Sequence, residues 1–262
     1  MKLFDTHCHF DDRAYKNDIN GVVDRAHAAG VCAMMTVGTD KQSSLKAVAL
    51  AEAIPGLFAS IGTHPHDAKD VDRTDLDFMR NLAKSPKVKA WGEIGLDFNR
   101  MYSPREIQEH WFLAQLLIAD ELGLPVIFHE RDSEGRLVEL LKKHPNSQRK
   151  GVVHCFSGNE KELTQYLEMG FYIGITGILT LKDRGAGLRE LVRIIPRDRL
   201  VVETDAPYLT PAPEKNHTRR NEPAFVKSVL LKLAEIRNIP PETLAADLWK
   251  NSCRLYNLSD RG

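Results

Sequence analysis

Short continuous runs of apolar residues alternate along the chain with longer segments in which apolar residues recur every three or four positions. Residues 31–37 are apolar almost without interruption, which indicates a strand buried on both faces. Residues 19–29 instead place Val22, Val23 and Ala26 on one side of a helix, and Gly30 ends it. Runs of the first kind predict strands at residues 3–7, 31–37, 57–62, 88–94, 124–128, 151–154, 171–175 and 200–204.

The clearest helix signal begins at Ser103. This residue predicts an N-cap, Pro104 occupies the first helical position, and Glu106 completes a capping box. Gly123 predicts the helix end. Its predicted buried face consists of Ile107, Trp111, Ala114, Leu117 and Ile118. The other predicted helices cover residues 41–53, 76–83, 136–143, 161–169, 187–194, 222–236 and 242–258.

A strict alternation of strands and helices predicts an α/β fold with a parallel sheet. Eight strands within 262 residues fit a TIM (β/α)8 barrel, with the last two helices covering the barrel after its final strand. No linker-like segment interrupts the pattern, so residues 1–262 are expected to form one domain. A doubly wound open sheet uses the same alternation and is the competing architecture.

The composition is that of an ordinary globular chain without a dominant charge. Lysine plus arginine and aspartate plus glutamate both number 36, so any polyanionic substrate must be recognised locally. No run approaches the roughly 18 apolar residues of a membrane helix, and no signal-peptide core precedes the first strand. The four cysteines lie far apart and suggest no disulfide framework. We therefore expect a cytoplasmic protein that does not associate with membranes.

Potential metal or phosphate ligands occur at or just after the carboxyl ends of six of the eight predicted strands. In a closed barrel these ends surround one mouth, whereas in an open sheet they lie along a line too long for one site. The pattern therefore favours the barrel, because one polar site then uses all of these residues. They are His7, His9, His64, Glu93, His129, His154 and Asp205.

Each of these residues alone has a simpler interpretation, since a single histidine or carboxylate after a strand is more often a core or capping residue. Their joint occurrence in phase with the strands favours a metal site instead. Nitrogen and carboxylate ligands without thiolate suit zinc, manganese, iron or magnesium. The six ligands His7, His9, Glu93, His129, His154 and Asp205 are too many for one tetrahedral ion and fit two ions.

Glu93 is the best candidate for a carboxylate shared by the two ions, because Gly92 and Gly95 beside it allow close approach. Such a pair of ions can clamp a phosphoryl oxygen and generate hydroxide at neutral pH. Asp205 could both bind an ion and accept the proton of the attacking water.

Three residues are candidates for substrate binding. His64 could donate to a phosphate or could stabilise its own loop. Arg131, in phase with His129, could reach a phosphate or form a surface ion pair. Arg220 lies in a proline-rich loop after the last strand, which could be a substrate rim or simply a solvated surface.

Taken together, the motifs resemble the TatD family of metal-dependent hydrolases. The loop at residues 214–218 departs from the shorter basic run expected there, so the specificity of the substrate rim does not follow from the resemblance. The matching segments are FDTHCHFD (residues 4–11), IGTHPHD (61–67), GEIGLD (92–97), LPVIFHER (124–131), GVVHCFSG (151–158), LVVETDAPYLTP (200–211) and RNEP (220–223).

The resemblance implies a TIM barrel with two or three divalent ions and metal-dependent DNase activity, often as an exonuclease that degrades from the 3′ end. Within it, one ion would be held by His7, His9, Glu93 and Asp205. The other would be held by Glu93, His129 and His154, with His64 near the scissile phosphate.

We therefore expect a phosphodiesterase in which Asp205, Glu93 and His64 are catalytic and the ions are Mg²⁺, Mn²⁺ or Zn²⁺. The expected substrate is DNA, bound weakly at strand ends and without sequence specificity, or a small phosphoester. The expected oligomeric state is a monomer. The alternatives are a deacylase or other amidohydrolase, such as a D-aminoacyl-tRNA deacylase, and a non-catalytic metal-binding barrel.

Overall fold

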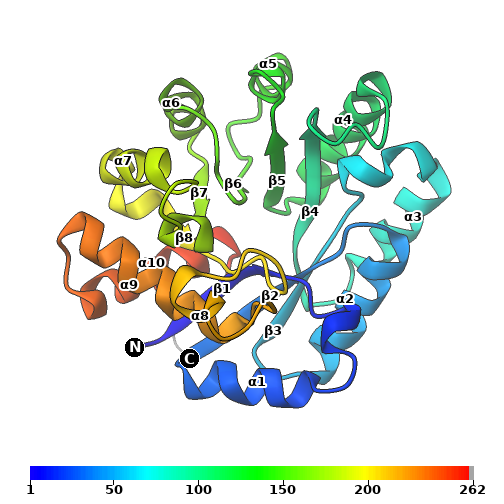
Figure 1. The fold of residues 1–262 in the computed structure, drawn as a ribbon. Helices are drawn as coiled ribbons and strands as arrows, with labels where there is room; N and C mark the ends of the chain where they lie inside the picture. The colour runs from blue at the N-terminus through cyan, green and yellow to red at the C-terminus, as the bar shows by residue number, and fades with distance from the viewer. Residues whose placement is uncertain (260–262) are drawn as a thin grey trace. The chain divides into compact units, whose positions relative to one another are not determined.

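The computed structural model describes residues 1–259. Within this range eight strands alternate with helices, and the strands form one sheet in the order β1 to β8 (Figure 1). The strands are β1 (Leu3–Cys8), β2 (Val31–Val37), β3 (Leu57–Ile61), β4 (Val88–Asp97), β5 (Val126–Arg131), β6 (Gly151–Val153), β7 (Tyr172–Ile175) and β8 (Leu200–Val202).

Seven α-helices lie between consecutive strands, and three more follow β8. Several short 3-10 turns complete the described elements. The helices are α1 (Ile19–Ala28), α2 (Lys41–Ala53), α3 (Arg73–Leu82), α4 (Arg105–Leu122), α5 (Arg136–Lys143), α6 (Glu160–Glu168), α7 (Ala186–Ile194), α8 (Ala212–Lys215), α9 (Val226–Arg237) and α10 (Pro241–Leu255).

The chain divides into two compact units. The first combines residues 1–36 with the chain from Ile173 onward, and the second spans Val37–Tyr172. In the first unit β1 pairs with β2 and β7 pairs with β8, all in parallel. The last strand also meets the first, because the His9 N–H donates to Ala206 O at 2.7 Å and the Asp205 N–H donates to His7 O at 2.9 Å. An open sheet with this strand order would leave β1 and β8 unpaired, so the predicted (β/α)8 barrel is confirmed.

The same unit has its own apolar core between β1, β8 and the two long C-terminal helices. The Phe4 ring lies 5.7 Å from the Tyr256 ring and 6.3 Å from the Trp249 ring, centroid to centroid. Both helices are shorter than predicted, since α9 begins at Val226 after a 3-10 turn and α10 ends at Leu255. They cover β1 and β8 within this unit, as expected.

In the second unit, β3, β4, β5 and β6 pair in parallel. Strand β4 continues to Asp97, three residues beyond its predicted end. Gly95 allows this extension, because a Cβ there would lie 1.9 Å from His129 O and the residue has φ +151°. No other residue could bring β4 this close to β5, so Glu93 and Asp97 come to lie on one continuous strand.

Helix α4 corrects two predictions. Its N-cap is Pro104 and its first residue is Arg105, one position later than predicted. The Ser103 hydroxyl does not cap the helix but donates to His66 O and accepts from the Lys69 N–H. The predicted buried face was wrong in part, because Ile107 and Leu117 are 37% and 56% exposed, whereas Ile118 is buried as predicted. The face that is buried consists of Gln108, Phe112, Gln115, Leu116, Ile118 and Ala119.

Two glutamines on this face explain the error. A count of apolar residues misses them, yet both are buried because their amides are hydrogen-bonded to backbone.

No helix within residues 1–259 is long and apolar enough to cross a bilayer. The four cysteines form no disulfide.

Candidate metal centre

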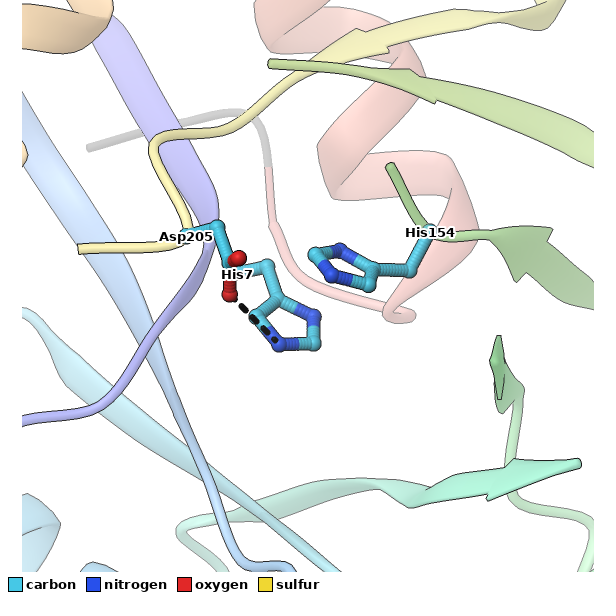
Figure 2. Close-up of side chains that lie close together, drawn as sticks. All are labelled: His7, His154 and Asp205. Carbon is cyan, nitrogen blue, oxygen red and sulfur yellow. Dashed lines mark ion pairs between the residues drawn. The ribbon is translucent and has the colours of Figure 1, made fainter. Parts of the chain in front are cut away.

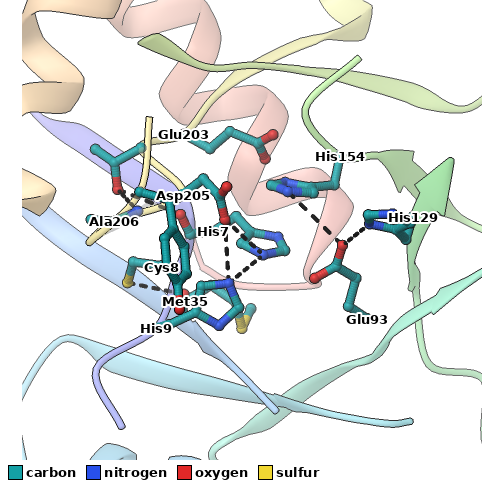
Figure 3. Close-up of polar contacts among 12 residues, drawn as sticks. His7, Cys8, His9, Met35, Glu93, His129, His154, Glu203, Asp205 and Ala206 are labelled. Carbon is teal, nitrogen blue, oxygen red and sulfur yellow. Dashed lines mark hydrogen bonds and ion pairs between the residues drawn. The ribbon is translucent and has the colours of Figure 1, made fainter. Parts of the chain in front are cut away.

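The first unit contains one cluster of donor atoms, at the end of β1 and just after β8. His7 and His9 face the same way because side chains alternate along a strand. Their Nε2 atoms are 3.3 Å apart, and Asp205 Oδ1 lies 3.7 Å from the first and 3.2 Å from the second (Figures 2 and 3). Cys8 points away and donates its S–H to Met35 O.

Neighbouring backbone holds Asp205 in place. Its N–H donates to His7 O, and its φ of +57° is a left-handed conformation that aspartate tolerates better than most residues. The preceding Thr204 is anchored by Asp5, whose carboxylate accepts the Thr204 N–H at 2.8 Å and the Thr204 hydroxyl at 2.6 Å. Burial raises the pKa of Asp5 to about 8. Asp5 was not predicted as a site residue, although it lies in the same strand phase as His7.

Two imidazole nitrogens and a carboxylate oxygen thus converge on one point. Nitrogen and oxygen donors at such spacing suit a divalent cation of the first transition row, or magnesium with more water ligands. The three side chains are buried or nearly so, which would shield a bound ion from bulk solvent. These atoms could therefore hold a metal ion.

The second unit contains its own cluster, built from the ends of four consecutive strands. Glu93 on β4 is its centre, with Oε1 2.6 Å from His129 Nδ1 and 4.0 Å from His154 Nε2 (Figure 3). His64, after β3, places its Nε2 3.1 Å from His129 Nδ1 and 3.7 Å from Glu93 Oε1. The predicted Glu93, His129 and His154 therefore lie together, and His64 joins them.

His129 and His64 of this cluster have pKa values shifted in opposite directions. Burial alone would lower the pKa of His129, but Glu93 and Asp97 outweigh it and raise that pKa to about 9. Burial, reinforced by the neighbouring His129, holds the pKa of His64 well below its usual value. His64 is thus neutral at pH 7. Without a metal, a proton on His129 balances the buried carboxylates around it.

Asp97 is a site residue that the sequence analysis missed. It is fully buried at the end of β4 and accepts hydrogen bonds from His66 Nε2 at 2.7 Å and His129 Nε2 at 3.2 Å. Burial would raise the pKa of Asp97, but the bonds from His129 and His66 lower it below its ordinary value. The sequence could have indicated Asp97, because Glu93, Gly95 and Asp97 share one face of a strand.

The buried glutamines of α4 hold the backbone of this cluster. Gln115 accepts the Thr63 N–H at 2.7 Å and donates to Thr63 O at 3.0 Å, which fixes the residue before His64. Gln108 accepts the Asp97 N–H at 2.8 Å and donates to Asp97 O at 3.0 Å. Helix α4 therefore aligns both strand ends from outside the sheet.

The predicted substrate residues Arg131 and Arg220 differ in their surroundings. Arg131 is partly exposed at the end of β5, and its side chain makes no hydrogen bond or ion pair with the part of the chain that the structure describes. Arg220 is engaged, with both terminal nitrogens 2.8 Å from Asp18 and one 2.7 Å from Glu222. This pairing with Arg220 lowers the pKa of Asp18 to about 2. Substrate binding by either arginine stays a prediction.

Known proteins resemble this chain over nearly its whole length. The family profile described as TatD related DNase matches residues 4–257. A Citrobacter rodentium protein named 3'-5' ssDNA/RNA exonuclease TatD is 40% identical over 259 residues, 98% of each chain. A Bacillus subtilis protein, named uncharacterized metal-dependent hydrolase YabD, is 37% identical over 98% of this chain and 100% of its own.

A solved structure agrees with these sequence matches. The TatD homologue YJJV from Escherichia coli has a TM-score of 0.91 and 31% sequence identity, covering 98% of both chains. The chain is a metal-dependent hydrolase, and it belongs to the TatD-related DNase family.

Proposed function

We propose that this hydrolase removes nucleotides from the 3′ ends of single-stranded DNA or RNA. The observation that carries the proposal is the pair of donor clusters, His7, His9 and Asp205 in one unit and Glu93, His129 and His154 in the other. Relatives at about 40% identity whose printed name is 3'-5' ssDNA/RNA exonuclease support the choice of bond and polarity.

We further propose that both units belong to one domain, residues 1–262, and that the two clusters act on one substrate. The six donors lie in the carboxyl-terminal halves of strands or just after them, and in (β/α)8 barrels these ends form a single catalytic face. Glu93 would then be the carboxylate shared by two divalent ions, Mg²⁺, Mn²⁺ or Zn²⁺. One ion would use His7, His9, Asp205 and Glu93, and the other Glu93, His129 and His154.

Such ions would supply Lewis-acid stabilisation of the phosphoryl oxygens and lower the pKa of water. Asp205 would accept the proton of the attacking water at Oδ1. His64 would donate to a phosphate oxygen from Nε2, because its Nδ1 accepts the His66 N–H at 3.1 Å and the neutral ring then carries its proton on Nε2. Burial favours this neutral donor, which stabilises phosphate without binding it as an ion pair.

Single-stranded ends suit the charge and the exposed aromatic side chains of the protein. A net charge of zero gives no general attraction for long duplexes, so binding depends on local contacts. Tyr208 is 52% exposed, and its ring lies 5.8 Å from the His9 ring. Tyr102 is similarly exposed 4.8 Å from the His66 ring. Either ring could stack on an unpaired base.

End-labelled DNA and RNA oligonucleotides test the proposal directly. Metal-stripped protein would be supplied with Mg²⁺, Mn²⁺ or Zn²⁺, with Glu93→Gln as the inactive control. A ladder that shortens from the 3′ end only with metal and intact Glu93 is the expected result. If no phosphodiester is cleaved, release of amino acid from D-aminoacyl-tRNA would identify the deacylase alternative. Gel filtration tests a monomer, and fractionation of cells tests a cytoplasmic location.

A further inference from the structure

Asp97 receives four hydrogen bonds, which fully define its role as an acceptor. Oδ2 accepts from His66 Nε2 at 2.7 Å and from His129 Nε2 at 3.2 Å. Oδ1 accepts the backbone N–H groups of Asn99 at 3.0 Å and Arg100 at 2.7 Å. Both oxygens are buried and engaged, so each imidazole nitrogen that faces Asp97 must carry a hydrogen.

This arrangement determines which nitrogen of a neutral His129 ring carries the lone pair that could bind a metal. With a hydrogen on Nε2, the neutral ring has its lone pair on Nδ1. Nδ1 is the atom that lies 2.6 Å from Glu93 Oε1, on the side of the ring facing the donor cluster. Gln108 accepts the Asp97 N–H and donates to Asp97 O, so the backbone that carries the carboxylate is held in place.

We propose that Asp97 is a positioning residue that fixes His129 as an Nδ1 metal ligand, by holding a hydrogen on Nε2. The inference rests on the proposed metal-binding role of His129 and adds to it the residue that selects the ligating nitrogen. Carboxylates that accept the distal N–H of a ligand histidine commonly set its tautomer and raise its basicity. Asp97 is not one of the six residues proposed to hold the ions.

The competing interpretation is that Asp97 is a structural partner of His66 alone. In that case its bond to His129 would be incidental, and loss of the carboxylate would affect loop stability but not metal binding. The two interpretations differ in the effect of Asp97→Asn. The asparagine oxygen would keep the two backbone N–H groups, so its NH2 group would face both imidazoles and require an acceptor at His129 Nε2. The ring hydrogen would then move to Nδ1 and compete with the metal.

Zinc binding and nitrogen-15 NMR of the histidine rings would test this. Titration of metal-free wild type with Zn²⁺ should show two equivalents, and Asp97→Asn should weaken one of them by about 10–100-fold while leaving the other unchanged. Asp132→Asn is a matched control in the neighbouring loop, because Asp132 is exposed and bonds only the Asn99 side chain among its described partners. The control should bind zinc like the wild type.

The NMR spectrum of zinc-loaded wild type decides the matter even if Asp97→Asn fails to fold. Long-range proton–nitrogen correlations should show His129 with a hydrogen on Nε2 and zinc on Nδ1. Zinc on Nε2, or two unchanged affinities in folded Asp97→Asn, would overturn the inference. Zinc on Nδ1 in a protein that cleaves no nucleic acid would support the inference and reject the proposed nuclease. Nuclease activity with zinc on Nε2 would do the reverse.

Discussion

The substitution Gln115→Leu should destabilise the protein through polar groups that it leaves buried without partners. The Gln115 side chain satisfies the Thr63 N–H at 2.7 Å, the Thr63 carbonyl at 3.0 Å and the Trp91 indole N–H at 3.3 Å. Leucine has a similar volume, so the cavity term is small. Each buried polar group without a partner costs about 1–3 kcal/mol. Because the indole bond is long and the loop can relax, we expect a total loss of about 3 kcal/mol.

Urea unfolding of the metal-free proteins would measure this loss, with fluorescence and circular dichroism as independent probes. Gln165→Leu on α6 is the matched control, since Gln165 is only partly buried and the change should stay within about 0.5 kcal/mol. A loss below about 1 kcal/mol for Gln115→Leu, with an unchanged urea dependence, would show that the glutamine is not the support of the Thr63 backbone.

Three further outcomes follow from the geometry. The pKa of His129 without metal is about 9, so zinc must displace a proton from His129 below that pH. The zinc affinity of one site should therefore fall about tenfold per pH unit from pH 8 to pH 6. An affinity that does not change with pH in titration calorimetry would contradict this prediction. Gly95→Ala should cost more than about 2 kcal/mol in urea unfolding, whereas Gly187→Ala in α7, where nothing obstructs a Cβ, should cost nothing. Tyr208→Ala should raise KM for single-stranded DNA about tenfold and Tyr208→Phe should not, and equal KM values would exclude stacking.

The sequence was informative wherever one physical rule determined the outcome. Strand periodicity and the polar residues at strand ends predicted the two clusters, because His7, His9, Glu93 and His129 occupy positions that a buried strand otherwise fills with apolar residues. The barrel followed from the same regularity, and the pairing of β1 with β8 confirms it.

What the sequence did not reveal depends on partners far away in the chain. Gln108 and Gln115 look like solvent-facing residues until the backbone groups they bond are known, so the predicted face of α4 was wrong in part. Asp5 and Asp97 look like ordinary strand and turn residues, because only the fold shows that they bond Thr204 and His129. A buried polar residue outside a pattern such as that of the strand ends is hard to recognise from sequence when its partner is far away in the chain.

The closure of β1 against β8 also determines when the first donor cluster can exist during synthesis. His9 and Asp205 are 196 residues apart, so the ribosome makes two ligands of this cluster almost at once and the third only near the end. The second unit, Val37–Tyr172, is continuous and emerges with His64, Glu93, His129 and His154 already present. A chain that stops before β8 would therefore carry one potential metal cluster and lack the other. The first strand to be made, β1, can therefore pair with β8 only after nearly the whole chain has been synthesised.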